Sequence, residues 1–231
     1  VTGVQLDGSS ELPADLVIFS IGARPNVALA QDAGLTIGYS GAIWVDEYLR
    51  TTAPDIFAVG DCAEKKDFFT RKVVPVMLAS TASAEASIAG ANLYSLRMIR
   101  DNRGTLATFS TRLGKTTLAS AGLTERRARE EGFDIVVGQA KTVNRHPGSL
   151  PDAHMTQVKL IFSADSLVLL GGQVAGEQEA GELINLIALA LQNRMTATQL
   201  ETLQVATHPL LIPAPTVYPL VTAAMHAIAQ A

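Results

Sequence analysis

The sequence predicts an α/β segment followed by an α+β segment, with a boundary near residue 104. The first observation is a short apolar run at residues 16–21, which is typical of a strand buried on both faces of a parallel sheet. The second is an Ala/Ser-rich pattern that predicts a long helix over residues 77–100, ended by the polar residues 101–104. The third is the change to strand pairs joined by turn residues after this break, which favours an α+β unit with hairpins.

Shorter elements fill the first segment. Residues 1–6 alternate weakly between apolar and polar side chains and precede a turn at residues 7–10. Asn26 is placed to cap a short helix that runs through Gln31 and ends at Gly34. The other expected features are two short strands and a charged loop, at residues 43–45, 56–59 and 65–72.

The second segment carries stronger local signals. Strands are predicted over residues 105–122 with an interruption at Gly114, and Thr124 is placed to cap a charged helix through Glu131. An apolar stripe at helical spacing predicts an amphipathic helix across residues 183–191. The stripe consists of Leu183, Ile184, Ile187 and Leu191. Three further strands, the last two forming a hairpin, and a final helix are expected at residues 135–137, 158–162, 167–170 and 218–229.

Composition and charge exclude several classes of protein. With 48% hydrophobic and 17% charged residues, the chain is not intrinsically disordered, and its net charge of −4 argues against a nucleic-acid partner. A single cysteine excludes an intramolecular disulfide, and no apolar stretch reaches the about 20 residues that a membrane span needs. The four histidines lack metal-binding spacing, and no secretory signal opens the chain. We therefore expect a cytoplasmic protein without a local metal site.

The most informative motif lies at residues 45–64 and reads VDEYLRTTAPDIFAVGDCAE. Its spacing of Thr, Pro-Asp-Ile, an aromatic residue and Gly-Asp resembles the second flavin-contacting motif of the pyridine nucleotide–disulfide oxidoreductase family. The stretch SIGARPN at residues 20–26 is similar to the segment where such chains leave the nicotinamide domain. Three later stretches, GLTE, VKLIF and GGQVAG, resemble the family's C-terminal interface domain. The resemblance covers essentially the whole chain, in order.

The resemblance implies a three-layer α/β FAD/NAD(P)-binding domain remnant followed by an α+β interface domain. Residues 1–40 are then the end of the NAD(P)-binding domain, 41–104 the C-terminal piece of the FAD-binding domain and 105–231 the dimerisation domain. Family members carry their GxGxxG fingerprints and redox cysteine upstream of the matched segment, and this chain contains no GxG. We therefore expect it to correspond to the C-terminal half, with neither turnover nor tight FAD binding by itself.

Four residues are predicted to contact the flavin. Gly60 ends a strand and lets the backbone approach a ligand closely, and the carboxylate of Asp61 can accept hydrogen bonds from hydroxyl groups. By resemblance, Asp61 binds the ribityl chain. The predicted helix begins near Met77 with free N–H groups and the positive end of its dipole. By resemblance, this tip, at Leu78 and Ala79, faces the pyrimidine end of the flavin and stabilises charge on the reduced ring.

Three other residues have competing interpretations. In the glutathione-reductase-like branch an interface-domain His-Pro carries the catalytic base, which makes His208 a candidate, but the glutamate expected five positions later is Pro213. The stretch HPLLIPAPTVYP is more similar to the single-cysteine branch, in which C-terminal aromatic residues, here Tyr218, reach the partner subunit's active site. The alternatives are a solvated loop histidine and a packed aromatic ring at a helix start. Cys62 is interpreted as a small neighbour of Asp61 and not as the redox cysteine.

The resemblance implies the C-terminal part of an FAD-dependent NAD(P)H oxidoreductase of the single-cysteine branch, which includes coenzyme A-disulfide reductases, NADH oxidases and NADH peroxidases. Hydride then passes from NAD(P)H to FAD, and electrons pass through an upstream cysteine to a small disulfide, polysulfide, peroxide or oxygen. A homodimer is expected to form through residues 105–231, with the apolar stripe and the Pro-rich segment at residues 209–219 in its interface. The alternative is that the stripe only covers its own sheet. Two other classes stay open: a flavin reductase that delivers electrons to a redox partner protein, and a non-catalytic dimerisation module.

Overall fold

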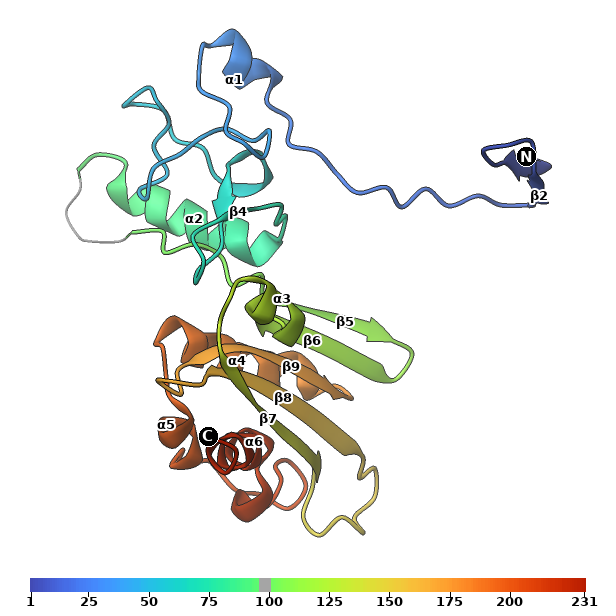
Figure 1. The fold of residues 1–231 in the computed structure, drawn as a ribbon, viewed down its shortest axis with the longest axis vertical. Helices are drawn as coiled ribbons and strands as arrows, with labels where there is room; N and C mark the ends of the chain where they lie inside the picture. Colours follow the sequence, from blue (N-terminus) through green and yellow to red (C-terminus); the bar gives the residue numbers. More distant parts are fainter. Residues whose placement is uncertain (96–100) are drawn as a thin grey trace.

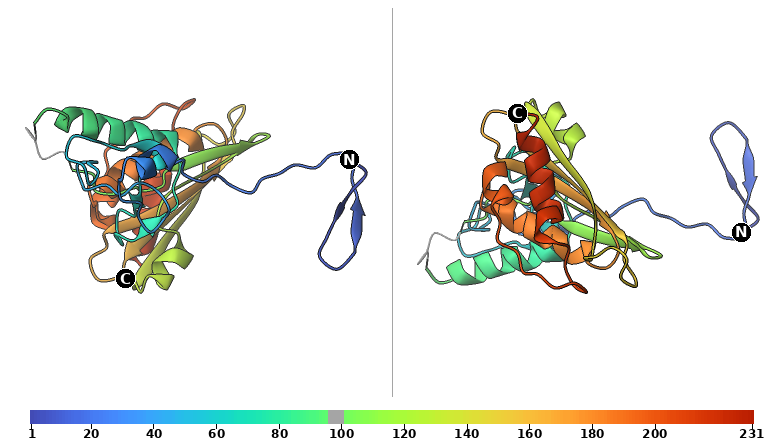
Figure 2. Two further views of the ribbon diagram at one scale, coloured as in Figure 1. Left: turned by 90° about the horizontal axis from the view of Figure 1, so that it is seen from above. Right: turned by 90° about the horizontal axis from the view of Figure 1, so that it is seen from below.

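A computed structural model describes residues 1–95 and 101–231 of the chain (Figure 1). The chain begins with an antiparallel hairpin of β1, Gly3–Gln5, and β2, Glu11–Pro13. The turn predicted at residues 7–10 is confirmed, since the N–H of Leu6 donates to the carbonyl of Ser10 at 2.8 Å. Figures 1 and 2 show this hairpin away from the rest of the molecule, at the end of an extended segment.

The prediction of a buried strand at residues 16–21 is wrong for this structure. The segment is extended but forms no strand, and Leu16, Ile18, Phe19 and Ile21 are between 76% and 89% exposed. A strand exists only where its backbone groups pair with a neighbour, and no other strand of the described residues lies beside this run. The apolar pattern identified the β-forming residues correctly, but it could not show whether a pairing partner is present.

A compact first unit follows this extended segment. Helix α1, Ala28–Asp32, begins after Val27 and not after the predicted cap Asn26. The two predicted strands form only isolated bridges, of which the one between Ile43 and Ala63 is parallel. The apolar side chains of the unit pack into one small core. The buried members of this core are Ala30, Ile43, Val45, Leu49, Ala58, Ala63 and Ala89.

The rest of the first unit leads into one long helix. The single-turn 3-10 helix η1, Gly60–Cys62, precedes a short hairpin of β3, Lys65–Lys66, and β4, Val73–Val74. The loop predicted over residues 65–72 therefore begins with a strand, and β4 directly follows it. Helix α2, Ala79–Asn92, is shorter than the helix predicted over residues 77–100. The last five residues of that predicted helix, 96–100, lie outside the described residues.

The second unit is built on a five-stranded antiparallel sheet with the order β5–β6–β9–β8–β7. Its strands are β5, Phe109–Leu113, β6, Thr116–Gly122, β7, Ile135–Val143, β8, Met155–Ser163, and β9, Leu169–Gly176. The interruption at Gly114 is confirmed as the β5–β6 turn, where φ is +63°. The β8–β9 hairpin is also confirmed. The predicted change to an α+β unit is therefore correct.

Helices cover one face of this sheet. Helix α4, Ala180–Gln192, packs on β6 and β9, and α6, Pro219–Ile228, packs on β7 and β8 (Figures 1 and 2). All four residues of the predicted stripe, from Leu183 to Leu191, are buried in the core beneath α4. The stripe therefore stabilises its own sheet and is not available to a partner subunit.

The remaining helices are short, and α3 packs against the opposite face of the sheet, where Ala128 contacts the cluster of Ile161 and Leu170. Helix α3, Glu125–Glu130, begins as predicted, because the Thr124 hydroxyl accepts a hydrogen bond from the N–H of Arg127 at 3.2 Å. Helix α5, Ala197–Glu201, was not predicted from the sequence, although Thr196 and Gln199 form a capping box at its start. The 3-10 helix η2, Pro215–Val217, leads into α6. Across residues 1–95 and 101–231, none of the helices has the length and apolar character to cross a bilayer.

Candidate active site

The turn that contains Gly60 requires a glycine. An extended segment pairs Ala58 with Leu49 through an N–H to carbonyl hydrogen bond of 3.1 Å, and the chain then turns sharply at Gly60. Gly60 is buried and has a φ of +73°, a left-handed conformation that costs other residues about 1–2 kcal/mol. The predicted end of a strand-like segment at Gly60 is thus present, and it places the next residue on an exposed turn.

Asp61 is the exposed residue of this turn. Its carboxylate makes no hydrogen bond or ion pair with any of residues 1–95 and 101–231, so all its acceptor positions face solvent. The neighbouring Cys62 is half-buried, and its Sγ lies 3.4 Å from the carbonyl oxygen of Val59. The turn therefore presents a carboxylate and turns the thiol toward its own backbone.

A buried ion pair between Lys65 and Glu85 contacts the backbone of the same turn. The Nζ of Lys65 lies 2.9 Å from Oε2 of Glu85, and both side chains are less than 5% exposed. Oε2 of Glu85 accepts the N–H of Gly60 at 2.8 Å, and Nζ of Lys65 donates to the carbonyls of Gly60 and Ala63. Sequence reasoning missed this pair. The available signal was that Glu85 is the only charged residue between Val73 and Leu96.

The N-terminus of α2 lies beside this turn. Leu78 is the N-cap residue and supplies no side-chain acceptor, so the first N–H groups of the helix lack a side-chain cap. Helix α2 packs against η1, and a Cβ built on Gly60 would lie 3.5 Å from Cβ of Ala82. The structure therefore places Gly60 and Asp61 on a turn beside the start of α2, where Leu78 and Ala79 lie.

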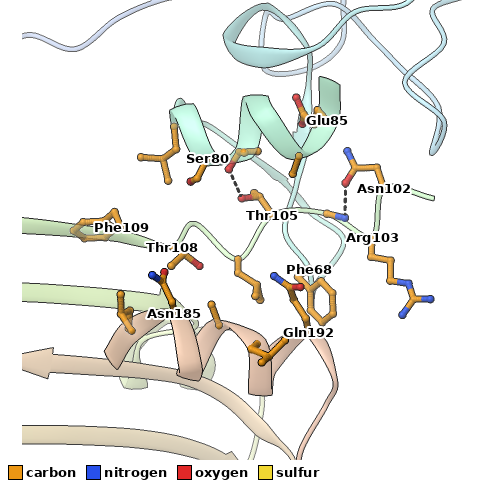
Figure 3. A pocket seen from close by; sticks show the side chains of 18 of the residues that line it. Phe68, Ser80, Glu85, Asn102, Arg103, Thr105, Thr108, Phe109, Asn185 and Gln192 are labelled. Carbon is orange, nitrogen blue, oxygen red and sulfur yellow. Dashed lines mark hydrogen bonds between the residues drawn. The ribbon is translucent and has the colours of Figure 1, made fainter. Parts of the chain in front are cut away.

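A cleft of about 1010 Å³ lies between α2 and α4 (Figure 3). Leu78 and Ala79 line it, whereas Gly60 and Asp61 do not. Figure 3 shows polar side chains along its sides, with Ser80 on α2 and Asn185 and Gln192 on α4. The tip of α2 is therefore open to a ligand from the cleft side, and Asp61 is exposed on a neighbouring turn.

The two other candidates lie in the second unit, in different surroundings. His208 is an exposed loop residue whose Nδ1 accepts the N–H of Leu210 at 3.3 Å. Tyr218 is 8% exposed at the start of α6, and burial raises the pKa of its hydroxyl above the ordinary value. Tyr218 lines a cavity of about 450 Å³ that does not include His208. Within one chain, the structure does not bring these two residues together.

The cavity beside Tyr218 contains a hydrogen-bonded cluster that the sequence did not indicate. Oε1 of Glu179 lies 2.7 Å from Nε2 of His154 and accepts the Thr156 hydroxyl at 2.8 Å. Burial of the Glu179 carboxyl opposes its ionisation, but hydrogen bonds from Thr156, its own backbone and His154 outweigh burial and hold its pKa below the usual value. His154 lies in the loop before β8 and is a structural partner of Glu179. The described residues contain no group of three or more side chains that could hold a metal ion.

The donors and acceptors of the first unit fit a flavin nucleotide. A carboxylate without a partner, as at Asp61, can accept hydrogen bonds from sugar-type hydroxyls. The uncapped N–H groups at the tip of α2 suit an electron-rich or anionic ring edge. These two features match what the resemblance assigns to Asp61 and to the pair Leu78–Ala79.

Comparisons with known proteins agree with this reading. Residues 1–86 match the family described as pyridine nucleotide-disulphide oxidoreductase, and residues 110–217 match that family's dimerisation domain. The chain is 34% identical over 178 residues to a CoA-dependent NAD(P)H sulfur oxidoreductase of Pyrococcus furiosus, covering 77% of this chain and 39% of the relative. It is 31% identical over 204 residues to an NADH oxidase of Methanocaldococcus jannaschii, covering 88% of this chain and 44% of the relative.

Solved structures give the same result. The structure of an NAD-dependent persulfide reductase from A. fulgidus matches 97% of this chain and 41% of its own length, with 34% identity and a TM-score of 0.86. The chain thus spans about two fifths of the length of these relatives. The predicted fold class and the similarity to sulfur-reducing enzymes and NADH oxidases are confirmed. The chain belongs to the pyridine nucleotide–disulphide oxidoreductase family.

Proposed function

We propose that this chain supplies the second flavin-contacting segment and the dimerisation unit of an FAD-dependent NAD(P)H oxidoreductase. The observation that carries the proposal is the exposed carboxylate of Asp61, free of partners among the described residues, on a buried glycine turn beside the uncapped tip of α2. An upstream segment of the kind found in the family would supply the dinucleotide fingerprints and the redox cysteine. As domain bounds we retain residues 1–40, 41–104 and 105–231.

The residues of this chain have separate roles in that proposal. Asp61 accepts hydrogen bonds from the ribityl hydroxyls, and Gly60 leaves room for the approach. The N–H groups at Leu78 and Ala79 stabilise negative charge at the pyrimidine edge. The chemistry that FAD supplies when bound is two-electron transfer between NAD(P)H and the substrate.

The substrate class follows the names of the relatives, which act on sulfur compounds or are called NADH oxidases. We propose a small disulfide, polysulfide, peroxide or oxygen as the electron acceptor, in a cytoplasmic enzyme. His208 and Tyr218 stay candidates for contacts with the substrate site of a partner subunit. Delivery of electrons to a redox partner protein is the alternative, and the stretch HPLLIPAPTVYP at residues 208–219 disfavours it, because such reductases usually carry a shorter and different C-terminal domain.

Replacing Asp61 with alanine tests the flavin site. With the upstream segment restored, we expect FAD to bind about 10- to 150-fold more weakly, because a hydrogen bond to a charged group contributes about 1.5–3 kcal/mol. FAD fluorescence on titration measures the dissociation constant. Asp165→Ala in the exposed β8–β9 turn is the matched control and should leave binding unchanged. Equal affinity of Asp61→Ala and the unaltered protein would remove Asp61 from the site, and stoichiometric FAD binding by the chain alone would contradict the need for an upstream segment.

We also propose that the second unit forms a two-fold homodimer, in line with its match to a dimerisation domain. The face of the sheet opposite α4 and α6 and the Pro-rich segment both expose apolar side chains. These are Phe109, Leu113, Leu118, Leu210, Leu211 and Val217. A permanent interface of this kind buries more than about 2,000 Å². Sedimentation at micromolar concentration should give twice 24.4 kDa, and a species of 24.4 kDa would rule the dimer out.

A further inference from the structure

The turn that presents Asp61 is fixed entirely through its neighbours. The N–H of Gly60 donates to the buried side chain of Glu85 at 2.8 Å, and its carbonyl accepts from the buried Lys65 side chain and from the N–H of Ala63 at 3.1 Å. Lys65 also donates to the carbonyl of Ala63 at 2.9 Å, so one ammonium group bridges the residues on either side of Asp61 and Cys62. The side chain of Asp61 itself contributes nothing to this arrangement within the described residues.

The pair also joins three elements of the chain. Lys65 lies on β3, Glu85 lies in the middle of α2, and the turn they hold is η1. Because the same helix carries the tip at Leu78 and Ala79, the contact between Glu85 and Gly60 fixes the turn relative to that tip. The Glu85 carboxylate therefore fixes the position of Asp61 relative to the start of α2.

The positive charge of Lys65 and the negative charge of Glu85 cancel, so the ion pair adds no net charge near Asp61. Oε2 of Glu85 carries both contacts, while Oε1 is buried without a hydrogen-bond partner among the described residues. An unpaired buried acceptor is unfavourable, and burying two charges costs further free energy. Stability alone therefore does not explain why an ion pair occupies this position.

From these contacts we infer that Lys65 and Glu85 are positioning residues, which hold Asp61 at the place and angle where it meets the flavin hydroxyls. The inference rests on the proposed function. It assigns the pair no contact with the flavin. Its consequence is that Asp61 contributes to FAD binding only while the pair holds the turn.

A mutant cycle on the protein with its upstream segment restored tests this coupling. In the native background Asp61→Ala should weaken FAD binding about 10- to 150-fold. In a background carrying Lys65→Met and Glu85→Leu, the same substitution should weaken binding less than about threefold, because the turn no longer presents the carboxylate. The background with Lys65→Met and Glu85→Gln restores an acceptor for the N–H of Gly60 and should recover part of the dependence on Asp61. If the variant with Lys65→Met and Glu85→Leu does not fold, the variant with Lys65→Met and Glu85→Gln is used to measure the effect of Asp61→Ala.

The control is a matched pair of substitutions far from the turn. Arg126→Met and Glu130→Gln remove an exposed pair on α3 whose nearest charged atoms lie 3.8 Å apart, and the full effect of Asp61→Ala should persist in that background. If Asp61→Ala has the same effect with and without the Lys65–Glu85 pair, the pair is purely structural and the inference is wrong. If Asp61→Ala has no effect even in the native background, the proposed flavin site fails instead.

Discussion

Replacing Lys65 with methionine is expected to lower the free energy of unfolding of the first unit by about 3–5 kcal/mol. The substitution leaves the Glu85 carboxylate buried without its cation, at 3% side-chain exposure. It also removes the hydrogen bonds of the ammonium group to the carbonyls of Gly60 and Ala63. A buried charge that loses its partner keeps its desolvation cost and loses the compensating attraction, which is why the effect is large.

Urea unfolding followed by tryptophan fluorescence measures this change. Trp44 is the only tryptophan of the chain and lies in the first unit, so its emission reports on that unit alone. Adding Glu85→Leu to Lys65→Met should recover a large part of the loss, because apolar residues can replace a buried ion pair at little cost. Glu47→Gln, at an exposed side chain of the first unit, should change stability by no more than about 0.5 kcal/mol. A Lys65→Met variant as stable as this control would contradict the prediction.

Replacing Gly171 with alanine is expected to destabilise the second unit by about 3 kcal/mol or more. A Cβ at this position in β9 would lie 1.8 Å from the carbonyl oxygen of Leu123 and 2.7 Å from its carbonyl carbon. These are backbone atoms at the junction of β6 and α3, so they cannot move aside as a side-chain tip would. The thermal midpoint should fall by about 10 °C, since each kcal/mol shifts it by about 2–4 °C in a chain of this size.

Gly181→Ala is the matched control for this substitution. Gly181 lies in α4, and a Cβ there would meet no atom within 4 Å. Because alanine favours a helix by up to about 1 kcal/mol over glycine, this variant should be as stable as the unaltered chain or more so. Thermal unfolding followed by circular dichroism at the strand and helix bands compares the two variants, and equal midpoints would show that the sheet tolerates a side chain at residue 171.

The predictions from the sequence were most accurate for features whose hydrogen bonds or backbone angles depend only on residues close together in the chain. Gly114 marks a turn because the turn itself needs a positive φ, and Thr124 caps α3 through an N–H only three residues away. The strand at residues 16–21 could not be judged in the same way, because pairing depends on a neighbour that no local pattern specifies. The stripe along α4 was identified correctly, but its pattern could not distinguish packing on its own sheet from packing on a partner.

The candidate flavin site likewise contains residues that the sequence predicted and residues that it did not. Gly60 and Asp61 were found because the residues beside them form a recognisable run, whereas Lys65 and Glu85 lie 20 residues apart on different elements. Periodicity relates residues within one helix or strand and carries no information on a contact between β3 and α2. A lone charge in an otherwise uncharged helix is the one trace that such a pair leaves in the sequence.

The exposed run at residues 16–21 offers an unpaired backbone edge to other chains. Its backbone donors and acceptors are free of strand partners along an apolar surface, so a strand with an open edge, including the same run of another copy, can pair with it. A two-fold dimer of the second unit closes after two copies, whereas edge-to-edge addition has no natural end. If the second unit forms the proposed dimer, the chain has one surface for finite assembly and one for open-ended growth. Sedimentation over a dilution series distinguishes them, because a dimer changes only between one and two copies whereas an open-ended species changes its mean mass continuously.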